Sequence, residues 1–366
     1  MKWDGRRTER LRCVRVTFPD MAEREEYPWS TGGSLSLSSL SDLRATGTLS
    51  FEGPAAPDQS SLLRLYYEAE DEDGQRHSEA MGTFFLALPA VNERGGKVSG
   101  DADLKSVLRV AAGDCYGRPY TVSKGTNAVA KARAVIEGLG LRTNRPECAY
   151  TLASEMTWEP DASWLKIAND LLAAAGYGAC DVDGYGTVVM APYVEPQSRE
   201  PSWVFADNDR SIVEPETSAD SNAGDVPNAY RAKWEDEQAS LWACALNVDP
   251  HHPASVGNRG YVQGKFVAVD ELPGADPSQR LAALKRLCEE ALQGATMETE
   301  HVQWKHPWVP VRPGDAVEID YRAAGLAWRG ALTNMEVSLG RHVSVESKAR
   351  RFVRASIQIE TQGGAW

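Results

Sequence analysis

Residues 161 to 193 read DASWLKIANDLLAAAGYGACDVDGYGTVVMAPY, and this stretch decides the fold class. It begins with an apolar stripe at helical spacing, formed by Trp164, Ile167, Leu171, Leu172 and Ala175. We predict a helix that Asp161 caps and Gly176 ends. Two short strands are expected around Asp183-Gly184, a pair that favours a tight turn. A helix followed directly by a hairpin is typical of a small α+β module.

The region before this stretch predicts a second helix of the same module. Thr126 or Asn127 can cap it, and Gly138 and Gly140 are expected to stop it. Its apolar face is formed by Val129, Ala132, Ile136 and Leu139. We therefore place an α+β insert module over residues 114–195.

In the first 113 residues, apolar and polar side chains alternate with a period of two. Leu63, Leu65 and Tyr67 alternate with Arg64, Tyr66 and Glu68, which is typical of a strand with one buried face. Similar segments precede and follow it, and Asp73-Gly74 predicts the turn of a hairpin. About six antiparallel strands without a long helix predict an N-terminal barrel-like domain over residues 1–113.

The rest of the chain predicts a surface crossover linker over 196–227 and a second β-barrel-like domain over 228–366. One helix, at 276–294, interrupts its strands. Asp276 is its predicted N-cap, Pro277 fits its first position, and Gln279 would complete a capping box. The fold class is thus mainly β with an α+β insert, built on two small antiparallel β-barrel domains. No short-period repeat is convincing in the sequence, and the two β units are candidates for distant copies.

Composition limits the classes of function. A formal net charge of −13 argues against wrapping of nucleic acid, because phosphate binding depends on Lys and Arg. No apolar run approaches the roughly 20 residues that cross a bilayer, and the charged start from Met1 to Arg10 lacks the apolar core of a signal peptide. Six scattered cysteines without a CxxC pair predict free thiols in a reducing cytoplasm and no metal cluster: Cys13, Cys115, Cys148, Cys180, Cys244 and Cys288.

The motifs of common enzyme classes are missing from the sequence. Gly95-Gly96-Lys97 lacks the other positions of a phosphate-binding loop, and His251-His252 is interpreted as an exposed loop pair. Carboxylate pairs two apart, such as Asp181 with Asp183 and Glu318 with Asp320, resemble a glycosidase dyad only superficially, because an acidic chain offers many. We expect no catalytic, cofactor or metal residues. Most tryptophans should be core, with a minority at a subunit interface among Trp234, Trp242, Trp304, Trp308 and Trp328.

Several stretches resemble the tail-hub and tail-associated minor tail proteins of phages, including siphophages and myophages. One runs from Ser163 to Leu172, through Gly176-Tyr177, to a hairpin ending Ala191-Pro192-Tyr193. Another includes Pro227-Asn228, the capped helix, His306-Pro307, and Pro313-Gly314-Asp315 before the strand from Ala316 to Tyr321. The resemblance covers about two thirds of the chain, from about residue 120 to 350. The residues that carry it have packing roles: Asp161, Trp164, Gly176, Asp276, Gln279, Pro313, Gly314 and Asp315.

The resemblance implies a virion structural protein with no active site, assembled in the bacterial host cytoplasm into the tail. It implies a homotrimer whose barrel domains form a ring that continues the tail tube at the baseplate hub or tail tip. DNA would pass through the lumen during ejection without specific binding. Implied partners are a distal tail or tube protein, a tape measure and a tip or fibre protein, with no membrane insertion. Two alternatives stay open: the hub of a contractile injection or secretion machine, and a carbohydrate-active or carbohydrate-binding β protein.

Overall fold

The computed structural model describes residues 1–194, 198–208, 212–213, 217–220, 225–236, 239–250, 252–269, 272–273, 276–296, 298–321, 326–340, 342–353 and 356–365. Strands dominate it, and the predicted fold class, mainly β with an α+β module, is confirmed. The chain divides into two compact units. The first contains residues 1–217 and 303–349, and the second contains residues 218–302 and 350–366.

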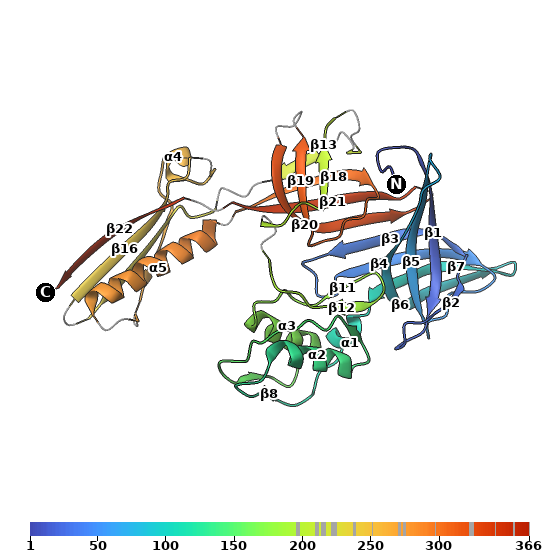
Figure 1. Ribbon diagram of the computed structural model, residues 1–366, viewed down its shortest axis with the longest axis horizontal. Coiled ribbons are helices and arrows are strands. Elements are labelled where there is room, and N and C mark those ends of the chain that lie inside the picture. The colour runs from blue at the N-terminus through green and yellow to red at the C-terminus, as the bar shows by residue number, and fades with distance from the viewer. Residues whose placement is uncertain are drawn as a thin grey trace. The chain divides into compact units, whose positions relative to one another are not determined.

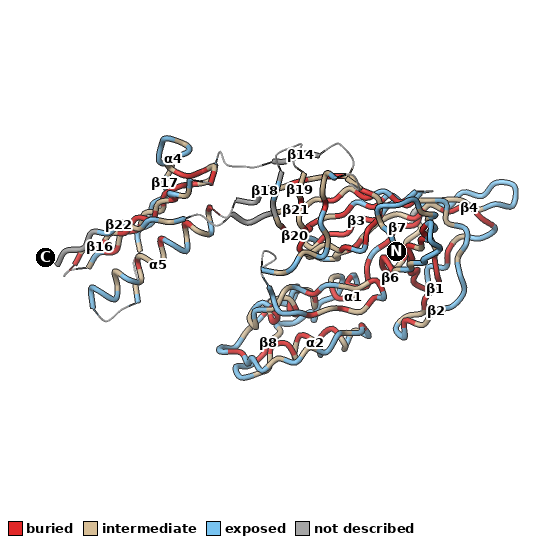
Figure 2. Tube along the Cα trace, turned by 45° about the horizontal axis from the view of Figure 1, so that its top comes forward, coloured by how far each residue is buried: buried red, intermediate tan, exposed pale blue. Residues whose placement is uncertain are grey.

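The first unit opens with seven strands, as the alternating pattern of residues 1–113 predicts. They are β1 (Arg7–Val16), β2 (Glu23–Glu26), β3 (Ser30–Ser38), β4 (Ala45–Gly53), β5 (Leu62–Asp71), β6 (Arg76–Arg94) and β7 (Lys97–Ser106). The hairpin predicted at Asp73-Gly74 joins β5 to β6, and Gly74 takes the left-handed conformation at φ +75°. Figure 2 shows buried residues recurring along these strands, and in β5 nearly every residue is buried.

Strands from the far end of the sequence join the same sheet. They are β18 (Glu298–Pro307), β19 (Ala316–Tyr321), β20 (Leu326–Leu339) and β21 (Ser344–Val353). The order is β14-β18-β21-β20-β3-β4-β7-β6-β5-β1-β2, so β20 pairs with β3 in antiparallel register. Off this path, β19 pairs with β20 and with β13 (Trp203–Ala206), while β14 spans Thr217–Asp220. The described strands form an open path and not a closed barrel.

The α+β module follows β7 (Figure 1). It contains α1 (Arg109–Ala112), β8 (Tyr120–Val122), α2 (Ala128–Gly138), β9 (Arg142–Thr143), β10 (Met156–Trp158), α3 (Trp164–Ala174), β11 (Asp181–Val182) and β12 (Thr187–Val189). The apolar faces of α2 and α3 meet in one buried cluster, which also includes Val16 and Leu62 from the first strands. This shared cluster attaches the module to the sheet, because the apolar area it removes from water stabilises both parts together.

The module contains two copies of one β-turn-α unit, β8 with α2 and β10 with α3, which the sequence does not reveal. Strands β8 and β10 pair antiparallel with Thr121 facing Thr157, 36 positions later, and their hydroxyl oxygens are 3.0 Å apart. The same shift of 36 positions relates two isolated bridges: Cys115 corresponds to Thr151 and Ser163 to Asn127, so the bridge Cys115–Ser163 corresponds to the bridge Asn127–Thr151. An antiparallel pair whose central residues are equivalent has a local two-fold axis between them. The copies therefore face each other across this axis.

The sequence analysis found no convincing short-period repeat, and the helix ends explain why the structural repeat is hidden. Asn127 caps α2 and Ser163 caps α3, each through its side-chain oxygen. Gly140 and Gly176 follow the two helices in the left-handed conformation, at φ +79° and +72°. Different residue types perform the same task at most positions, and identical residues recur only at Thr121/Thr157, Ala132/Ala168 and Gly140/Gly176 within the aligned segments Tyr120–Leu141 and Met156–Tyr177.

The second unit is a four-stranded sheet with a helix on one face. Its strands are β15 (Ala229–Glu235), β16 (Ala239–Asn247), β17 (Gly264–Ala268) and β22 (Ile357–Ala365), in the order β17-β15-β16-β22. The short α4 spans Val256–Arg259, and α5, at Pro277–Thr296, packs against β15, β16 and β22 (Figure 1). Leu284, Cys288 and Leu292 form the buried stripe of α5.

The predicted domain boundaries at residues 113, 195 and 227 differ from the edges of the compact units. Strands β18 to β21 were expected in a second β domain, but β20 pairs with β3, so they lie largely in the first unit. Within the predicted linker, β13 pairs in parallel with β19. The linker residues 196–197, 209–211, 214–216 and 221–224 lie outside the described residues. Among the described residues, no helix is long and apolar enough to cross a membrane.

Candidate functional site

The hairpin β11–β12 lies directly against strand β6. A Cβ built on Gly184 would lie 1.8 Å from the carbonyl oxygen of Ala80, so only glycine fits this contact. Asp183 forms the turn by accepting hydrogen bonds from the backbone amides of Tyr185 and Thr187, at 2.9 and 2.8 Å. The hydroxyl of Thr83 donates to the Gly184 carbonyl at 2.8 Å. The sequence DGYG thus builds a turn shaped to lie on the sheet.

Arg64 secures this contact from the strand side. Its side chain is almost fully buried, and its guanidinium donates to the hydroxyl of Thr83 at 2.9 Å and to the carbonyl of Tyr185 at 3.0 Å. A third bond, at 2.7 Å, reaches the carboxylate of Glu23. The hydroxyl of Tyr66 also donates to Glu23, and together with Arg64 it lowers the pKa of that carboxyl. The charge of Arg64 is therefore paired as well as hydrogen-bonded.

Two further arginines hold backbone carbonyls around the same contact. Arg44 donates to the carbonyl of Cys180 at 2.8 Å and to that of Ser39. Arg312, in the turn before β19, donates to the carbonyl of Ala80 at 2.7 Å. We call Arg44, Arg64 and Arg312 the arginine joint, because they connect three segments of the first unit that are distant in sequence. Planar guanidinium groups suit this task, since each presents several donors in fixed directions.

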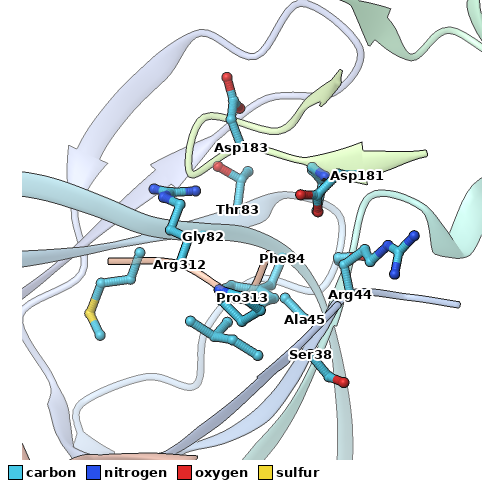
Figure 3. A pocket seen from close by; sticks show the side chains of 14 residues that line it. Ser38, Arg44, Ala45, Gly82, Thr83, Phe84, Asp181, Asp183, Arg312 and Pro313 are labelled. Atoms are coloured by element: carbon cyan, nitrogen blue, oxygen red, sulfur yellow. Dashed lines mark hydrogen bonds between the residues drawn. The ribbon is translucent and has the colours of Figure 1, made fainter. Parts of the chain in front are cut away.

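A cavity of about 40 Å³ lies beside two members of the arginine joint, Arg44 and Arg312 (Figure 3). Asp181 points into it, whereas Asp183 points away toward its own turn. Although Asp181 is exposed by surface area, the surrounding pocket wall desolvates its carboxyl and raises its pKa. Burial also raises the pKa of Asp315. The space has room for a few water molecules, and its lining mixes charged side chains such as Arg44 and Arg312 with apolar ones such as Leu37, Met81 and Phe84.

A second polar network joins the first strand to the last part of the first unit. Arg7 and Glu9 form an ion pair at 2.8 Å with side chains only 6% and 7% exposed. Arg7 also donates to the carbonyl of Trp308 at 2.8 Å, and the hydroxyl of Tyr67 donates to Glu9 at 2.8 Å. The backbone amide of Val343 donates to the other carboxylate oxygen of Glu9 at 3.0 Å. Arg7 also donates to the carbonyl of Trp3 at 3.1 Å, so both members of the buried pair have several hydrogen-bond partners.

The residues predicted to carry the family resemblance have structural roles. Trp164 begins α3, and Gly176 ends that helix: its amide donates to Ala173 and the next amide to Leu172. The prediction for Asp161 is wrong, since the N-cap is Ser163, whose hydroxyl accepts from the amide of Lys166. Both residue types favour caps, and Ser163 is the one directly before the first helical turn.

The predicted helix start at Asp276 and the predicted turn at Pro313-Gly314-Asp315 both occur in the structure. In the second unit, the Asp276 carboxylate accepts from the backbone amide of Gln279 at 2.9 Å, and α5 starts at Pro277. In the first unit, the carboxylate of Asp315 accepts from the amide of Arg312 at 2.8 Å, with Pro313 between them and Gly314 at φ +99°. The role of these motif residues in assembly stays a prediction.

Sequence reasoning missed the arginine joint. It interpreted Arg64 and Tyr66 as the outward face of a strand, but both are buried, 4% and 6% exposed, because the hairpin β11–β12 covers them. It also interpreted the His251-His252 pair as exposed. His252 is fully buried, with its Nε2 2.9 Å from the carbonyl of Thr296, while His251 lies outside the described residues. Neither burial has a local sequence signal, since both arise from distant segments.

The carboxylate pairs do not form a dyad in the structure. Asp183 is held in its turn while Asp181 faces the cavity. Glu318 lies 3.8 Å from Arg329 on the neighbouring strand. Among the described residues, no group of three or more His, Cys, Asp or Glu side chains could hold a metal ion. The six cysteines are free, and four of them are buried: Cys13, Cys180, Cys244 and Cys288.

Two of the tryptophans noted in the sequence are core residues. Trp304 and Trp308 are each 2% exposed, and Phe205 contacts Trp304 edge-on with ring centroids 5.0 Å apart. Trp234 is 6% exposed and packs under α5. The side chain of Trp328 lies outside the described residues. Trp242 is half-buried, and among the tryptophans with described side chains only these three and Trp158 are buried, so the prediction that most are core is wrong. An interface role stays a prediction.

The chain combines an open β sheet that carries a helical module with a second, helix-covered sheet, and solved structures with a similar fold include phage tail proteins. The chain is similar to the tail protein from Neisseria meningitidis MC58, with a TM-score of 0.61 and 13% identity over 93% of this chain and 96% of that one. It is also similar to the 43 kDa tail protein of prophage MuSo2 from Shewanella oneidensis, with a TM-score of 0.60 and 12% identity over 94% and 98% of the two chains. These likenesses show that the chain shares the fold of these two tail proteins.

A third likeness is to a chain of the Francisella PdpA-VgrG complex, half-lidded. Its TM-score is 0.56 and its identity 6%, over 96% of this chain and 59% of that one. This chain thus resembles only part of that longer protein. No family model matches the sequence, and no curated protein matches it.

Proposed function

We propose that this chain is a structural, non-enzymatic hub protein of a phage or prophage tail tip. In this role it forms a homotrimeric ring that continues the tail tube and adapts it to the threefold tip. Its neighbours would be a distal tail or tube protein, a tape measure and a tip or fibre protein. The mature location would be the virion tail.

The observation that carries the proposal is the extent of the structural likeness. Two tail proteins match along nearly their whole length and along nearly the whole of this chain, including both compact units. A match limited to one sheet would support only a common building block, since folds recur with unrelated functions. The arginine joint adds support for a structural role, because it fixes the module to the sheet with polar contacts.

The acidic composition supports passage of DNA through the ring. With 39 basic and 52 acidic residues, the chain carries an excess of negative charge that repels phosphate. We propose that Asp and Glu outnumber Lys and Arg along the lumen, so that DNA moves without binding. An electron microscopy map of the assembled ring with Lys and Arg along the channel would contradict this part of the proposal.

The oligomeric state tests the ring directly. Light scattering of the purified full chain at several concentrations should give three times the 40.0 kDa mass of one chain, and negative-stain images of that peak should show a ring with a central hole. Because some hubs assemble only on a neighbour, the measurement is repeated with a tube or distal tail protein from the same genome. A chain that stays monomeric in both conditions contradicts the proposal.

The hub of a secretion machine is the second candidate, and the likeness to a chain of a VgrG complex favours it. Both roles predict a ring, so the partner distinguishes them. Co-purification of the chain with a tube protein encoded beside capsid genes supports the phage role. Co-purification with a secretion-machine tube protein, and not with the phage one, supports the second candidate.

A further inference from the structure

Four aromatic rings gather at one corner of the α+β module. Tyr120 lies at the centre, with ring centroids 5.5 Å from Tyr116, 5.3 Å from Trp164 and 6.2 Å from Trp158. Tyr116 and Trp164 are 5.6 Å apart. Tyr116 lies in the exposed loop before β8, and half of its side chain faces solvent. This aromatic corner, defined by Tyr116, Tyr120, Trp158 and Trp164, is thus partly open.

The two-fold repeat of the module provides an internal comparison for this corner. The corner takes two rings from each copy, and the two-fold-related positions hold aliphatic residues: Leu152, Met156, Val122 and Ala128. Three of these are buried, and Leu152 is 3% exposed where its counterpart Tyr116 is 50% exposed. The same backbone unit therefore folds with small apolar side chains at these places. Packing of the repeated unit therefore does not by itself require aromatic rings at these positions.

Polar groups accompany the rings in a specific arrangement. The indole nitrogen of Trp164 donates to the carboxylate of Asp114 at 3.1 Å, which fixes the ring. The ammonium group of Lys131 lies over the ring of Tyr120, 5.5 Å from its centroid. An acceptor thus lies at the edge of the Trp164 ring and a donor over the face of Tyr120, and their charges are opposite.

We propose that the half-exposed ring of Tyr116, which Tyr120 and Trp164 support at steep angles of 76° and 60°, forms a binding platform for a neutral oligosaccharide. The C–H face of a pyranose ring packs on an aromatic face, while its hydroxyl groups donate to the Asp114 carboxylate and accept from the Lys131 ammonium. A glycan fits better than a protein partner, because an apolar protein interface needs several hundred Å² and this corner offers one half-exposed ring. An anionic glycan would meet a chain with a net charge of −13. The inference is independent of the ring-forming role.

Titration of the full-length chain with soluble oligosaccharides tests the platform. The probes are cellotetraose and chitotetraose, followed by tryptophan fluorescence and confirmed by calorimetry. We expect one of them to bind the unmodified chain and Tyr116→Ala to weaken that binding by at least about fivefold, since a stacked ring contributes roughly 1 kcal/mol. Tyr116→Phe should bind nearly as well. The matched control is Tyr150→Ala, an exposed tyrosine of the same module that is outside the corner, and it should leave binding unchanged.

Three outcomes would overturn the inference. The first is no binding of either sugar at 10 mM by a chain whose thermal unfolding is normal. The second is equal loss of binding in Tyr116→Ala and Tyr150→Ala. The third is binding of a proline-rich peptide, but of neither sugar, that depends on Tyr116; this would assign the corner to a protein ligand. Thermal unfolding of each variant separates a loss of binding from a loss of fold.

Discussion

The carboxylate of Glu9 accepts a hydrogen bond at 3.0 Å from the backbone amide of Val343, which lies 334 positions later in the chain. The same carboxylate pairs with Arg7, and both side chains are nearly buried. A buried ion pair of this kind needs both charged side chains, because removal of one charge leaves the other buried without compensation. The contact therefore ties the first strand to the end of the first unit.

Glu9→Gln should lower the free energy of unfolding by about 3 kcal/mol, since it leaves Arg7 buried without a counter-charge. Calorimetric or denaturant unfolding measures the change. Glu25→Gln is the control: Glu25 pairs with Arg15 at 2.6 Å but is 65% exposed, so its loss should cost about 0.5 kcal/mol. Equal effects of the two substitutions would show that burial does not govern this ion pair.

Gly184→Ala should weaken the contact between the module and the sheet. The added Cβ meets the carbonyl oxygen of Ala80 at 1.8 Å, so the hairpin must move, at a cost of about 2 kcal/mol. Hydrogen exchange at the amides of β11 and β12 should become faster. Gly178→Ala is a matched control in the same module, because its Cβ finds nothing closer than 3.8 Å. Unchanged exchange in Gly184→Ala would contradict the fixed contact.

The N-cap of α3 can be tested by replacing each of its two candidate residues with alanine. Ser163→Ala removes the oxygen that accepts from the Lys166 amide and should cost about 1 kcal/mol of stability. Asp161→Ala should change stability by less than about 0.5 kcal/mol, as expected of an exposed site away from such features. Chemical denaturation of both variants measures this. A larger loss in the Asp161 variant would restore the assignment made from the sequence.

Acidification should destabilise the first unit through His306. Burial lowers the pKa of His306 from 6.5 to about 4, and its Nε2 is 2.8 Å from the hydroxyl of Ser347. The unfolded chain binds a proton first as the pH falls, so stability is retained above pH 6.5 and decreases between pH 6.5 and 4, by up to about 3 kcal/mol.

Unfolding at several pH values measures the slope caused by His306. His306→Gln should flatten it between pH 6.5 and 4, at the cost of lower stability at neutral pH. His342→Gln, which changes an exposed histidine, should retain the slope of the unmodified chain. An unchanged slope in His306→Gln would assign the acid sensitivity to other groups.

Local signals in the sequence predicted the fold class well. Alternation gave the strands of residues 1–113, and Asp276 with Pro277 marked the start of α5 correctly, because caps and strand faces depend on neighbouring residues. The prediction at Asp161 failed by two residues, since Asp and Ser favour the same position. The aromatic corner and the arginine joint had no local signal.

Non-local pairing explains what the sequence could not provide. Arg64 looks like a solvent-facing strand residue until the hairpin at Tyr185 covers it. Strand β20 alternates as any half-buried strand does, and nothing in it indicates that its partner is β3. The two-fold repeat was hidden because Asn127 and Ser163, different residues, perform the same task. Each of these features depends on residues more than 30 positions apart.

The pairing of β3 with β20 has a consequence for synthesis on the ribosome. Ser36 donates to Glu336 at 2.6 Å, a partner 300 positions later, and at about 5–20 residues per second the edge of β3 waits tens of seconds for it. An unpaired edge invites association with other nascent chains. The sequence of β3, STGGSLSLS, is rich in serine and glycine, both poor at forming intermolecular β structure. Its polarity thus protects the growing polypeptide until the completing strand has emerged.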